Sequence, residues 1–312
     1  ERFGVAIGTS FGGMTTLEAG YERLYGERNP RLHPLTIPRI MYNAAASHLS
    51  MFFSARGPIL AISTACASGA QAIGWAYQQI KYGAADVMLA GGADAPITFG
   101  VMKAWEALRV LASGRGDPTR ACRPFSRDRE GLVVGEGAAV LLLEDYERAR
   151  ARGARIYAEI VGYGTSADAG HITDPSIEGP ARALRAALAE AEIAPEEVDY
   201  INAHGTATKA NDRIETEAIK LIFGAHARRV AISSTKAVHG HAMGAAGAIE
   251  FVAALLALQH GIIPPTAHYT EPDPECDLDY VPNCAREQPL RVVLSNSFAF
   301  GGINAVLVAR RV

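Results

Sequence analysis

The sequence is poor in cysteine and carries no surplus of positive charge. Its 312 residues include four cysteines, and no two of them have the CxxC spacing of a zinc or redox site. A disulfide framework is therefore not expected, and a reducing, cytoplasmic compartment fits best. The formal net charge of −3 argues against a general nucleic-acid-binding protein, because binding to phosphates needs a positive surplus.

Very long hydrophobic runs are also missing. The longest apolar stretches, such as 248–258, are shorter than a membrane span and lie among helix signals. The chain opens with Glu1, Arg2 and Phe3 and continues into a strand-like run, without the basic and apolar regions of a signal peptide. With 49% hydrophobic residues the chain can bury a large core. We expect a globular protein without a membrane segment or secretion signal.

Short β-branched runs alternate with longer helical patterns, which predicts an α/β fold with a mostly parallel sheet covered by helices. Amphipathic spacing predicts helices that include 184–191 and 214–222, and Gly224 fits the end of the second. The stretch 93–136, with one helix at 101–111, is interpreted as a surface excursion. The expected strands span residues 3–8, 59–63, 86–91, 137–143, 156–163, 199–203, 230–234, 291–297 and 303–309.

Two segments, 59–83 and 229–261, look like versions of one unit. Each consists of an apolar strand, a turn of small residues and a helix that ends at glycine. Such a duplication indicates two similar halves, with functional turns at the ends of paired strands, where open α/β sheets place their ligands. The halves are expected to span 1–146 and 147–312.

Cys66 follows an expected strand and begins an expected helix in the sequence STACASGAQA. A thiol at this position is close to a helix N-terminus, which favours the thiolate, and its small neighbours let a substrate approach. This is how a nucleophile is built, although a buried structural cysteine explains the segment equally well. The other three cysteines lack this setting.

Two histidines are expected at strand ends beside glycine. His204 ends DYINAHG, and His241 follows ISSTKAVHGH, with Lys236 five residues earlier. An imidazole at such a position can reach a substrate in a cleft, but a structural histidine is the commoner explanation for either one alone. His239 is assigned no role. Zinc binding by Cys66, His204 and His241 has no support from local spacing, so we expect no metal.

The motifs TACASG, NAHGTAT, STKAVHGHAMGAAGAIE and NSFAFGGIN occur in this order and together resemble the β-ketoacyl-acyl-carrier-protein synthases, closest to the type II elongating enzymes of fatty acid synthesis. The resemblance implies the thiolase-like fold, a duplicated αβαβα arrangement in five layers with five strands in each half. We find four strands in the first half and five in the second. The family begins with a further strand and a helical region ahead of this chain's first residue, so this region is expected to be lacking.

The resemblance also implies roles for the matching residues. Cys66 accepts the acyl group, and His204 and His241 assist decarboxylation of the extender and hold the developing enolate oxygen. Lys236 matches the active-site lysine and Glu250 its ionic partner, a pairing that is also expected because a buried lysine without a partner is costly. Two N–H donors in a dry site stabilise an enolate without a metal or other cofactor.

Gating and substrate-binding residues follow from the same resemblance. Phe300 and Gly301 match a mobile loop that gates acyl entry, and the N–H of Phe300 would join that of Cys66 in an oxyanion hole. Thr206 and Thr208 match hydroxyls that hold the pantetheine arm of the carrier.

Other positions match the family only partly. Asp212 and Glu215 match acidic family positions, but a solvated helix N-terminus explains both equally well, so we assign them no catalytic role. The family often has serine at Ala207, a Pro and Gly pair within 209–211 and glycine at Ala299. The first two changes leave catalysis intact but can alter the tunnel or the carrier contact, and the third can stiffen the gate.

The implied reaction is a decarboxylative Claisen condensation, an acyltransferase activity that elongates a fatty acyl chain by two carbons. The implied partners are an acyl carrier protein, which is acidic, and a second copy of the chain in a homodimer with strand 59–63 at the interface. A basic patch near the tunnel mouth is therefore expected, and Arg31 is our choice for it.

Three other interpretations stay open. A polyketide ketosynthase uses the same Cys, His and His set. A non-catalytic partner subunit has lost its nucleophile, which the presence of Cys66 argues against. An inactive fragment would expose an unpaired strand edge. A degradative thiolase is set aside, because it needs a second cysteine near the C-terminal glycine loop.

Overall fold

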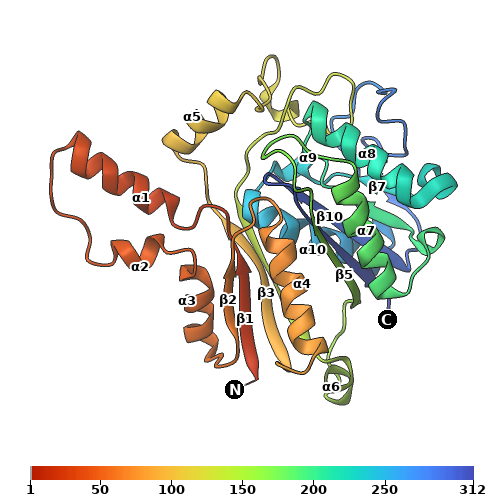
Figure 1. The fold of residues 1–312 in the computed structure, drawn as a ribbon, viewed down its shortest axis with the longest axis horizontal. Coiled ribbons are helices and arrows are strands. Elements are labelled where there is room, and N and C mark those ends of the chain that lie inside the picture. The colour runs from red at the N-terminus through yellow and green to blue at the C-terminus, as the bar shows by residue number, and fades with distance from the viewer. Residues whose placement is uncertain (1) are drawn as a thin grey trace.

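The computed structural model describes residues 2–312 and contains two sheets with helices between and outside them (Figure 1). The first sheet has the strand order β2–β1–β3–β4, the second has the order β5–β11–β10–β6–β7, and β8 pairs with β9. The strands are β1 Phe3–Gly8, β2 Ile59–Ile62, β3 Val87–Asp94, β4 Gly137–Glu144, β5 Glu159–Ala167, β6 Tyr200–Asn202, β7 Ala231–Ser233, β8 Ile262–Ile263, β9 Arg286–Glu287, β10 Val292–Ala299 and β11 Ile303–Arg310.

The helices separate into a central pair and outer groups. Short 3-10 or π turns link several of them. The α-helices are α1 Met14–Tyr21, α2 Thr36–Ile40, α3 Ala44–Phe53, α4 Ser68–Lys81, α5 Phe99–Leu108, α6 Tyr146–Ala151, α7 Glu178–Ala191, α8 Lys209–Phe223, α9 Lys236–His239 and α10 Ala246–His260. The expected join between the halves at 146/147 falls in α6, between the last strand of one sheet and the first strand of the other.

Each sheet combines parallel and antiparallel pairs. In the first sheet β1 runs parallel to β2 and β3, whereas β4 is antiparallel to β3. In the second sheet β6 runs parallel to β7 and β10, whereas β11 is antiparallel to β10 and β5. Both sheets are thus mixed, with four parallel and three antiparallel pairs between them, so parallel pairing predominates only slightly. The short turn between β10 and β11 reverses the chain direction and gives one of the antiparallel pairs.

Helices α4 and α10 form the central layer between the two sheets, and they belong to the two segments that resemble each other in sequence. Their apolar side chains, among them Ile73 of α4 and Phe251 of α10, share one core cluster with residues of both sheets. Helices α7 and α8 cover the outer face of the second sheet (Figure 1). This arrangement confirms the predicted five-layer αβαβα fold, and it brings together the turns that precede α4 and α10.

All nine expected strands are present, with four in the first sheet and five in the second. The largest difference is β5, which spans Glu159–Ala167 instead of 156–163. Its bounds follow its partner, because β5 pairs with β11 from Glu159↔Arg310 to Ala167↔Ile303. Tertiary pairing therefore decides where this strand begins and ends.

The interpretation of 93–136 as a surface excursion is wrong for its second part. Phe125 and Arg129 are almost fully buried, and Leu132 and Val134 are also buried. Polar composition was misleading here because the Arg129 guanidinium is neutralised inside the protein by Asp212 and Asp273.

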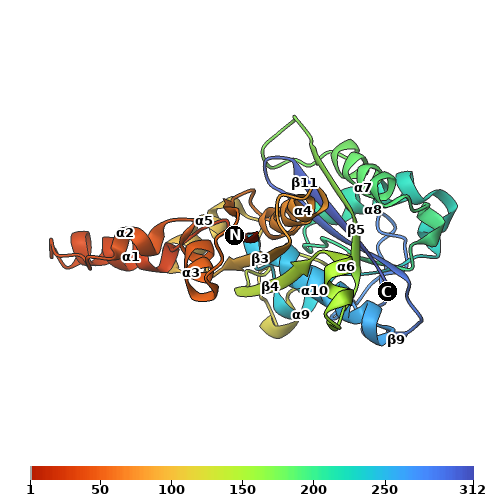
Figure 2. The same cartoon turned by 90° about the horizontal axis from the view of Figure 1, so that it is seen from below.

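The segment between β1 and β2 forms an arm that the sequence analysis did not anticipate. Helices α1 and α2 project from the two sheets in both views (Figures 1 and 2), while α3 packs against the first sheet through Ala46 and Leu49. The arm and α3 expose large apolar side chains, including Tyr25 at 76% and Phe52 at 81%. Such exposure in a globular protein marks an interaction surface.

One helical stretch, Met243–His260, is long and apolar enough to cross a membrane by length and composition. The expectation from sequence that no stretch reaches this length is therefore wrong. However, 67% of this stretch is buried inside the protein, and it includes the central helix α10. This stretch therefore has the length and composition of a membrane-spanning helix because it contains a buried core helix.

We expect Gly74→Ala to destabilise the fold. A Cβ on Gly74 of α4 would lie 2.3 Å from the Tyr163 ring of β5, so the ring or the helix must shift. This overpacking should cost about 1–3 kcal/mol, reduced by the better helix propensity of alanine. The free energy of unfolding in urea measures the effect. Gly170→Ala is the control, since no described atom lies within 4 Å of its Cβ, and an equal effect of both substitutions would contradict the prediction.

Candidate active site

Cys66 lies in the turn between β2 and α4. Ala65, the residue before it, has the left-handed φ of +49°, which is uncommon for a residue other than glycine. The Ser68 hydroxyl holds this turn, because it donates to the carbonyl of Ala65 at 2.6 Å and accepts from the N–H of Thr64 at 2.8 Å. The strained turn places the buried Cys66 thiol against residues of the second half.

Two histidines from the second half lie beside the thiol. Nε2 of His241 is 3.0 Å from Sγ of Cys66. The rings of His204 and His241 are 5.4 Å apart and nearly perpendicular, at 86°. The structure therefore brings together the three residues that the sequence analysis singled out, from turns 175 residues apart in the case of Cys66 and His241.

Hydrogen bonds determine which nitrogen of each imidazole carries the proton. Nζ of Lys236, which can only donate, lies 3.3 Å from Nδ1 of His204. The N–H of Met243 donates to Nδ1 of His241 at 3.3 Å. In both neutral rings Nδ1 therefore accepts, and the proton is on Nε2. Two Nε2–H donors are thus available to a substrate oxygen.

Lys236 is fully buried and has three acceptors around its ammonium group. It forms an ion pair with the equally buried Glu250. It also donates to the backbone carbonyl of His204 at 2.6 Å and lies close to Nδ1 of the His204 ring. A buried ammonium group is costly to desolvate, and these three acceptors replace the water that it has lost. Lys236 therefore fixes both the position and the tautomer of His204.

Burial and the Lys236 charge determine the protonation states. Burial, assisted by the nearby ammonium, lowers the pKa of both His204 and His241 well below 6.5, so both rings are neutral at pH 7. Burial also raises the pKa of Cys66 to about 11, although the charge of Lys236 and the N–H of Phe300 act against it. The expectation that the helix N-terminus produces a thiolate is therefore wrong for the resting site, because desolvation outweighs it.

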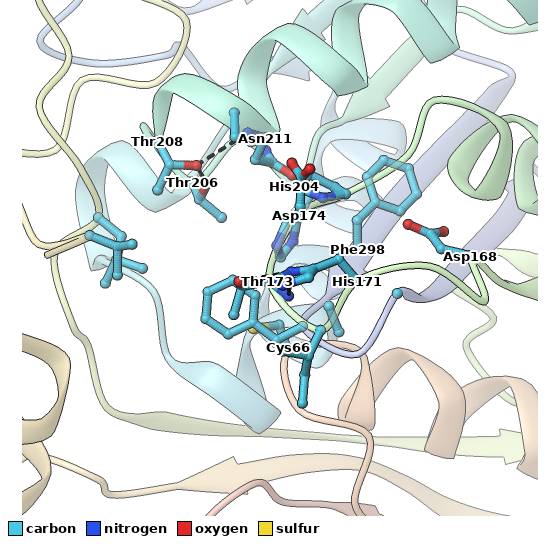
Figure 3. Close-up of a pocket in the computed structure, with 18 of the residues that line it drawn as sticks. Cys66, Asp168, His171, Thr173, Asp174, His204, Thr206, Thr208, Asn211 and Phe298 are labelled. Carbon is cyan, nitrogen blue, oxygen red and sulfur yellow. Dashed lines mark hydrogen bonds between the residues drawn. The ribbon is translucent and has the colours of Figure 1, made fainter. Parts of the chain in front are cut away.

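A cavity opens in front of these groups (Figure 3), and Cys66, His204, Thr206, Thr208 and Phe298 are labelled around it. Thr206 and Thr208 approach each other through their hydroxyls at 2.9 Å, and Thr208 also caps the N-terminus of α8. Part of the remaining wall is apolar and consists of Trp105, Leu108, Val110, Leu132 and Ile172. Polar side chains line other parts of it, namely Asp168, His171, Thr173, Asp174, Asn211 and Asn304.

The predicted gating residues occupy the turn between β10 and β11. Phe300 lines the cavity and stacks on Trp105, with ring centroids 6.0 Å apart. Its N–H and that of Cys66 both approach Sγ of Cys66 and lower its pKa. Gly301 is exposed, with a φ of +85°, and donates its N–H to the carbonyl of Ile172 at 2.7 Å. The positive φ requires glycine here.

Asp212 and Glu215 of α8 are fully buried, which contradicts their interpretation as a solvated helix N-terminus. Glu215 accepts from the N–H groups of His204 and Gly205, each at 2.8 Å, and therefore holds the histidine turn. Asp212 accepts from the N–H of Phe125 at 2.7 Å. The sequence signal was available, since the acids of NDRIE stand three residues apart on one helix face.

Two family models match the chain. That of the β-ketoacyl synthase N-terminal domain matches residues 1–149, and that of the β-ketoacyl synthase C-terminal domain matches residues 157–270. The chain belongs to the β-ketoacyl synthase family. Its resemblance to this family, stated above from four motifs, is confirmed, and the chain is a condensing enzyme of the acyltransferase type by descent.

Curated relatives cover the whole chain, which spans about three quarters of their length. Nodulation protein E of Rhizobium sp. (strain N33) is 54% identical over 311 residues, 100% of this chain and 76% of the relative. The 3-oxoacyl-[acyl-carrier-protein] synthase 2 of Staphylococcus aureus (strain COL) is 45% identical over 313 residues, 100% of this chain and 75% of the relative.

Solved ketosynthases share the fold. A type II polyketide ketosynthase in complex with its acyl-carrier protein and bound to a hexaketide matches with a TM-score of 0.96 and 40% identity, covering 100% of this chain and 78% of that one. A β-ketoacyl synthase from Burkholderia phymatum STM815 matches with a TM-score of 0.94 and 41% identity, covering 100% and 76%.

The three side chains at the centre of this ketosynthase site also offer a possible set of metal ligands. One donor atom each from Cys66, His204 and His241 lies within 4.8 Å of the others. The Lys236 ammonium beside His204 would repel a cation there. The absence of a metal therefore stays a prediction, which has this electrostatic argument in its favour.

We expect His241→Asn to change how stability depends on pH. A histidine whose folded-state pKa is below 6.5 contributes its full share to the free energy of unfolding above pH 6.5. This contribution is lost as the pH falls toward the folded-state pKa. As the pH falls from about 6.5 to about 5, the free energy of unfolding of the variant should therefore decrease less steeply than that of the unmodified protein. The difference between the two slopes should be up to about 1.4 kcal/mol per pH unit. Urea unfolding at several pH values measures this difference.

The exposed His48 on α3 provides the control, because it lies outside the cavity and reports the effect of replacing a histidine as such. Burial raises the pKa of Glu250 to about 7, which contributes a slope of the opposite sign. That contribution is present in all three proteins and cancels in the comparison. An identical pH dependence in His241→Asn and the unmodified protein would contradict the assigned protonation state.

Proposed function

We propose that this ketosynthase elongates an acyl chain by two carbons, through decarboxylative condensation of an acyl group on Cys66 with malonyl-acyl carrier protein. The observation that carries the proposal is the buried thiol facing two imidazoles, both of which present Nε2–H to the same cavity. Donors of this kind in a dry site stabilise an oxyanion better than water does. They fit the two charged stages of the reaction.

In the first stage the Cys66 thiol attacks the thioester of the acyl carrier. A C–S bond to Cys66 forms, the C–S bond to the carrier breaks, and the thiol proton passes to the leaving carrier thiolate. The N–H groups of Cys66 and Phe300 would hold the oxyanion of the tetrahedral intermediate, since both approach Sγ in the structure. Because the pKa of Cys66 is about 11, the thiol loses its proton during attack rather than beforehand.

In the second stage a malonyl thioester enters and loses carbon dioxide. The electron pair of the broken C–C bond becomes an enolate, whose oxygen accepts from Nε2–H of His204 and His241. The enolate carbon then attacks the acyl carbonyl on Cys66, so that a C–C bond forms and the C–S bond to Cys66 breaks. The Cys66 thiolate that is released takes up a proton from solvent water. The neutral form of both imidazoles suits this role, because a neutral ring offers a donor without attracting the substrate carboxylate.

One part of the cavity wall, formed by Trp105, Leu108, Val110 and Leu132, is apolar and suits a hydrocarbon chain, and we therefore propose elongation of fatty acyl chains, a 3-oxoacyl-acyl-carrier-protein synthase activity. Other parts of the wall carry hydrogen-bonding side chains, among them His171, Thr173 and Asn211, which could contact a more polar chain. A polyketide ketosynthase is the second candidate. It is supported by the 40% identity to a structure bound to a hexaketide.

We propose an acyl carrier protein as the substrate-delivering partner. Arg109 and Lys209 are exposed, and each stands between two cavity-lining residues in the sequence, so both lie at the rim of the cavity. An acidic carrier would be attracted to these charges. Arg31, chosen from the sequence, is exposed on the arm and does not line the cavity, so it is the weaker candidate.

We also propose a dimer that covers β2 and the arm. Among residues 2–312, no strand pairs with the outer edge of β2, and Ile59 and Leu60 in it are 45% and 38% exposed. The arm, which carries the exposed Tyr21 and Tyr25, projects from the part of the molecule that contains β2 (Figure 1). A second copy would cover both features, and a related chain is the alternative occupant.

A cytoplasmic location belongs to the same proposal. All four cysteines are free thiols, and three of them are buried. This is compatible with a reducing compartment. Labelling of the protein in fractionated cells would test the location independently of its activity.

Acylation of Cys66 is the first test. Incubation with an octanoyl-loaded acyl carrier should add the octanoyl mass to the intact protein, because the thiol faces the cavity. Cys66→Ala should abolish the adduct, whereas Cys122→Ala should retain it, since Cys122 is buried outside the cavity. Intact-protein mass spectrometry measures all three. An adduct that survives in Cys66→Ala would refute the nucleophile assignment.

The same experiment separates the two substrate classes. Malonyl carrier is added to protein acylated with either a saturated octanoyl group or an acetoacetyl group, and the 3-oxo products are compared. Faster extension of the octanoyl group supports fatty acyl elongation. Exclusive extension of the acetoacetyl group would favour the polyketide assignment.

We expect Ile59→Lys to weaken self-association. A lysine on the edge of β2 places a charge in the proposed interface, which costs more than the loss of the apolar contact alone. Sedimentation velocity should show a dimer for the unmodified protein and a larger share of monomer for the variant. Leu221→Lys on α8 is the matched control, because Leu221 is also exposed, at 52%, but lies away from β2. A monomeric unmodified protein would contradict the proposal.

A further inference from the structure

A buried carboxylate outside the cavity connects the turns that carry Cys66 and His241. Asp94 is the last residue of β3 and is 5% exposed. It does not line the cavity, and neither the sequence analysis nor the reaction described above uses it.

Each oxygen of Asp94 accepts two hydrogen bonds, all from uncharged groups. Oδ1 accepts from the hydroxyl of Thr9 at 2.5 Å and from the N–H of Phe11 at 3.2 Å. Oδ2 accepts from the N–H of Ser10 at 2.8 Å and from the N–H of Gly244 at 2.7 Å. Thr9 to Phe11 belong to the first half of the chain and Gly244 to the second, so one carboxylate joins the halves.

These contacts continue to the reacting groups on both sides. The Ser10 hydroxyl donates to the carbonyl of Ala65 at 2.9 Å, directly before Cys66. Gly244 follows Met243, whose N–H donates to Nδ1 of His241. Because Nε2 of His241 lies 3.0 Å from Sγ of Cys66, the contacts close into a hydrogen-bonded ring.

The ring is tightly packed at Gly244. A Cβ there would lie 2.5 Å from the nitrogen of Ser10 and 2.6 Å from Oδ2 of Asp94. The halves therefore meet backbone to backbone at this point, and only a carboxylate supplies four acceptor positions for the donors that converge on it.

We propose that Asp94 is a positioning residue for the reaction, which holds the Cys66 turn of one half and the His241 turn of the other at hydrogen-bond distance. Its substitution should alter the chemistry of Cys66 even though Asp94 touches neither the thiol nor the substrate. The inference rests on Cys66 as the proposed nucleophile.

Asp94→Asn tests this role with almost no change in volume. The amide replaces one carboxylate oxygen by an NH₂ group, which faces backbone N–H donors and cannot accept from them. The ring of contacts should loosen, and the hydrogen bond from Nε2 of His241 to Sγ of Cys66 should lengthen. Because this hydrogen bond stabilises the thiolate, weakening it should raise the pKa of Cys66 further.

The readout is the rate at which iodoacetamide alkylates Cys66 between about pH 7 and about pH 10, resolved by peptide mass spectrometry. We expect alkylation of Asp94→Asn to be about tenfold slower at the lower pH values, with the pH profile displaced upward by about one unit. Lys236, Glu250, His204 and His241 are the titratable groups around the thiol, and all are unchanged in the variant. Alkylation requires no condensation, so this inference and the proposed function can fail separately.

Ser10→Ala and Asp199→Asn complete the design. Ser10→Ala breaks the ring at Ala65 and leaves the four bonds to Asp94 intact, so it should displace the profile in the same direction by a smaller amount. Asp199→Asn is the control. Asp199 also accepts two backbone hydrogen bonds, from Arg291 at 2.6 Å and from Val292 at 3.0 Å, but it lies outside the ring. It should leave the profile unchanged.

A folded Asp94→Asn variant with an unchanged profile overturns the proposal. So does a profile displaced downward with faster alkylation, since this would show only that the site had opened to water. If Asp94→Asn does not fold, Ser10→Ala decides: an upward displacement supports the proposal, and an unchanged profile overturns it.

Discussion

The site depends on the close approach of two helices in the central layer. A Cβ on Gly69 of α4 would lie 2.9 Å from the carbonyl oxygen of Gly244, and one on Gly247 of α10 would lie 2.9 Å from the Cβ of Ala70. Small residues on both helices therefore allow the backbones to meet. Because Cys66 precedes α4 and His241 precedes α10, this approach places the thiol and the imidazole at hydrogen-bond distance.

The same packing removes water, and this has opposite effects on the reacting groups. Desolvation keeps both imidazoles neutral and able to donate through Nε2–H, as the proposed enolate step requires. It also raises the pKa of Cys66 to about 11, which works against a resting thiolate. Lys236 offsets part of this cost without contacting the thiol, and Glu250 compensates its charge. In the proposed reaction the thiolate of Cys66 therefore forms during acyl transfer and is not present beforehand.

How much could be predicted from the sequence depended on the type of signal. The fold class, the strands and the convergence of Cys66, His204, Lys236 and His241 followed from hydrophobic runs and from motifs that stay local in the chain. The arm at α1 and α2 was missed because its exposed apolar residues have no periodic pattern that marks a core. The burial of Arg129 was missed because charged residues near Gly and Pro predict a surface, and that of Asp212 and Glu215 because acids at a helix N-terminus are usually solvated. Only the tertiary structure shows that Arg129 pairs with Asp212 and that Glu215 accepts from backbone N–H groups.

The duplication also explains why the two halves supply different chemistry. The segments AISTAC (61–66) and AISSTK (231–236) end at corresponding positions after β2 and β7, so Cys66 and Lys236 stand at the same place in their units. Beyond this point the second unit has the extra turn of α9, which carries the chain to His241 before α10 begins. One half thus presents the proposed nucleophile, and the other presents a buried cation and an N–H donor. The two turns face each other beside the central helices, and together they form a site that neither unit contains alone.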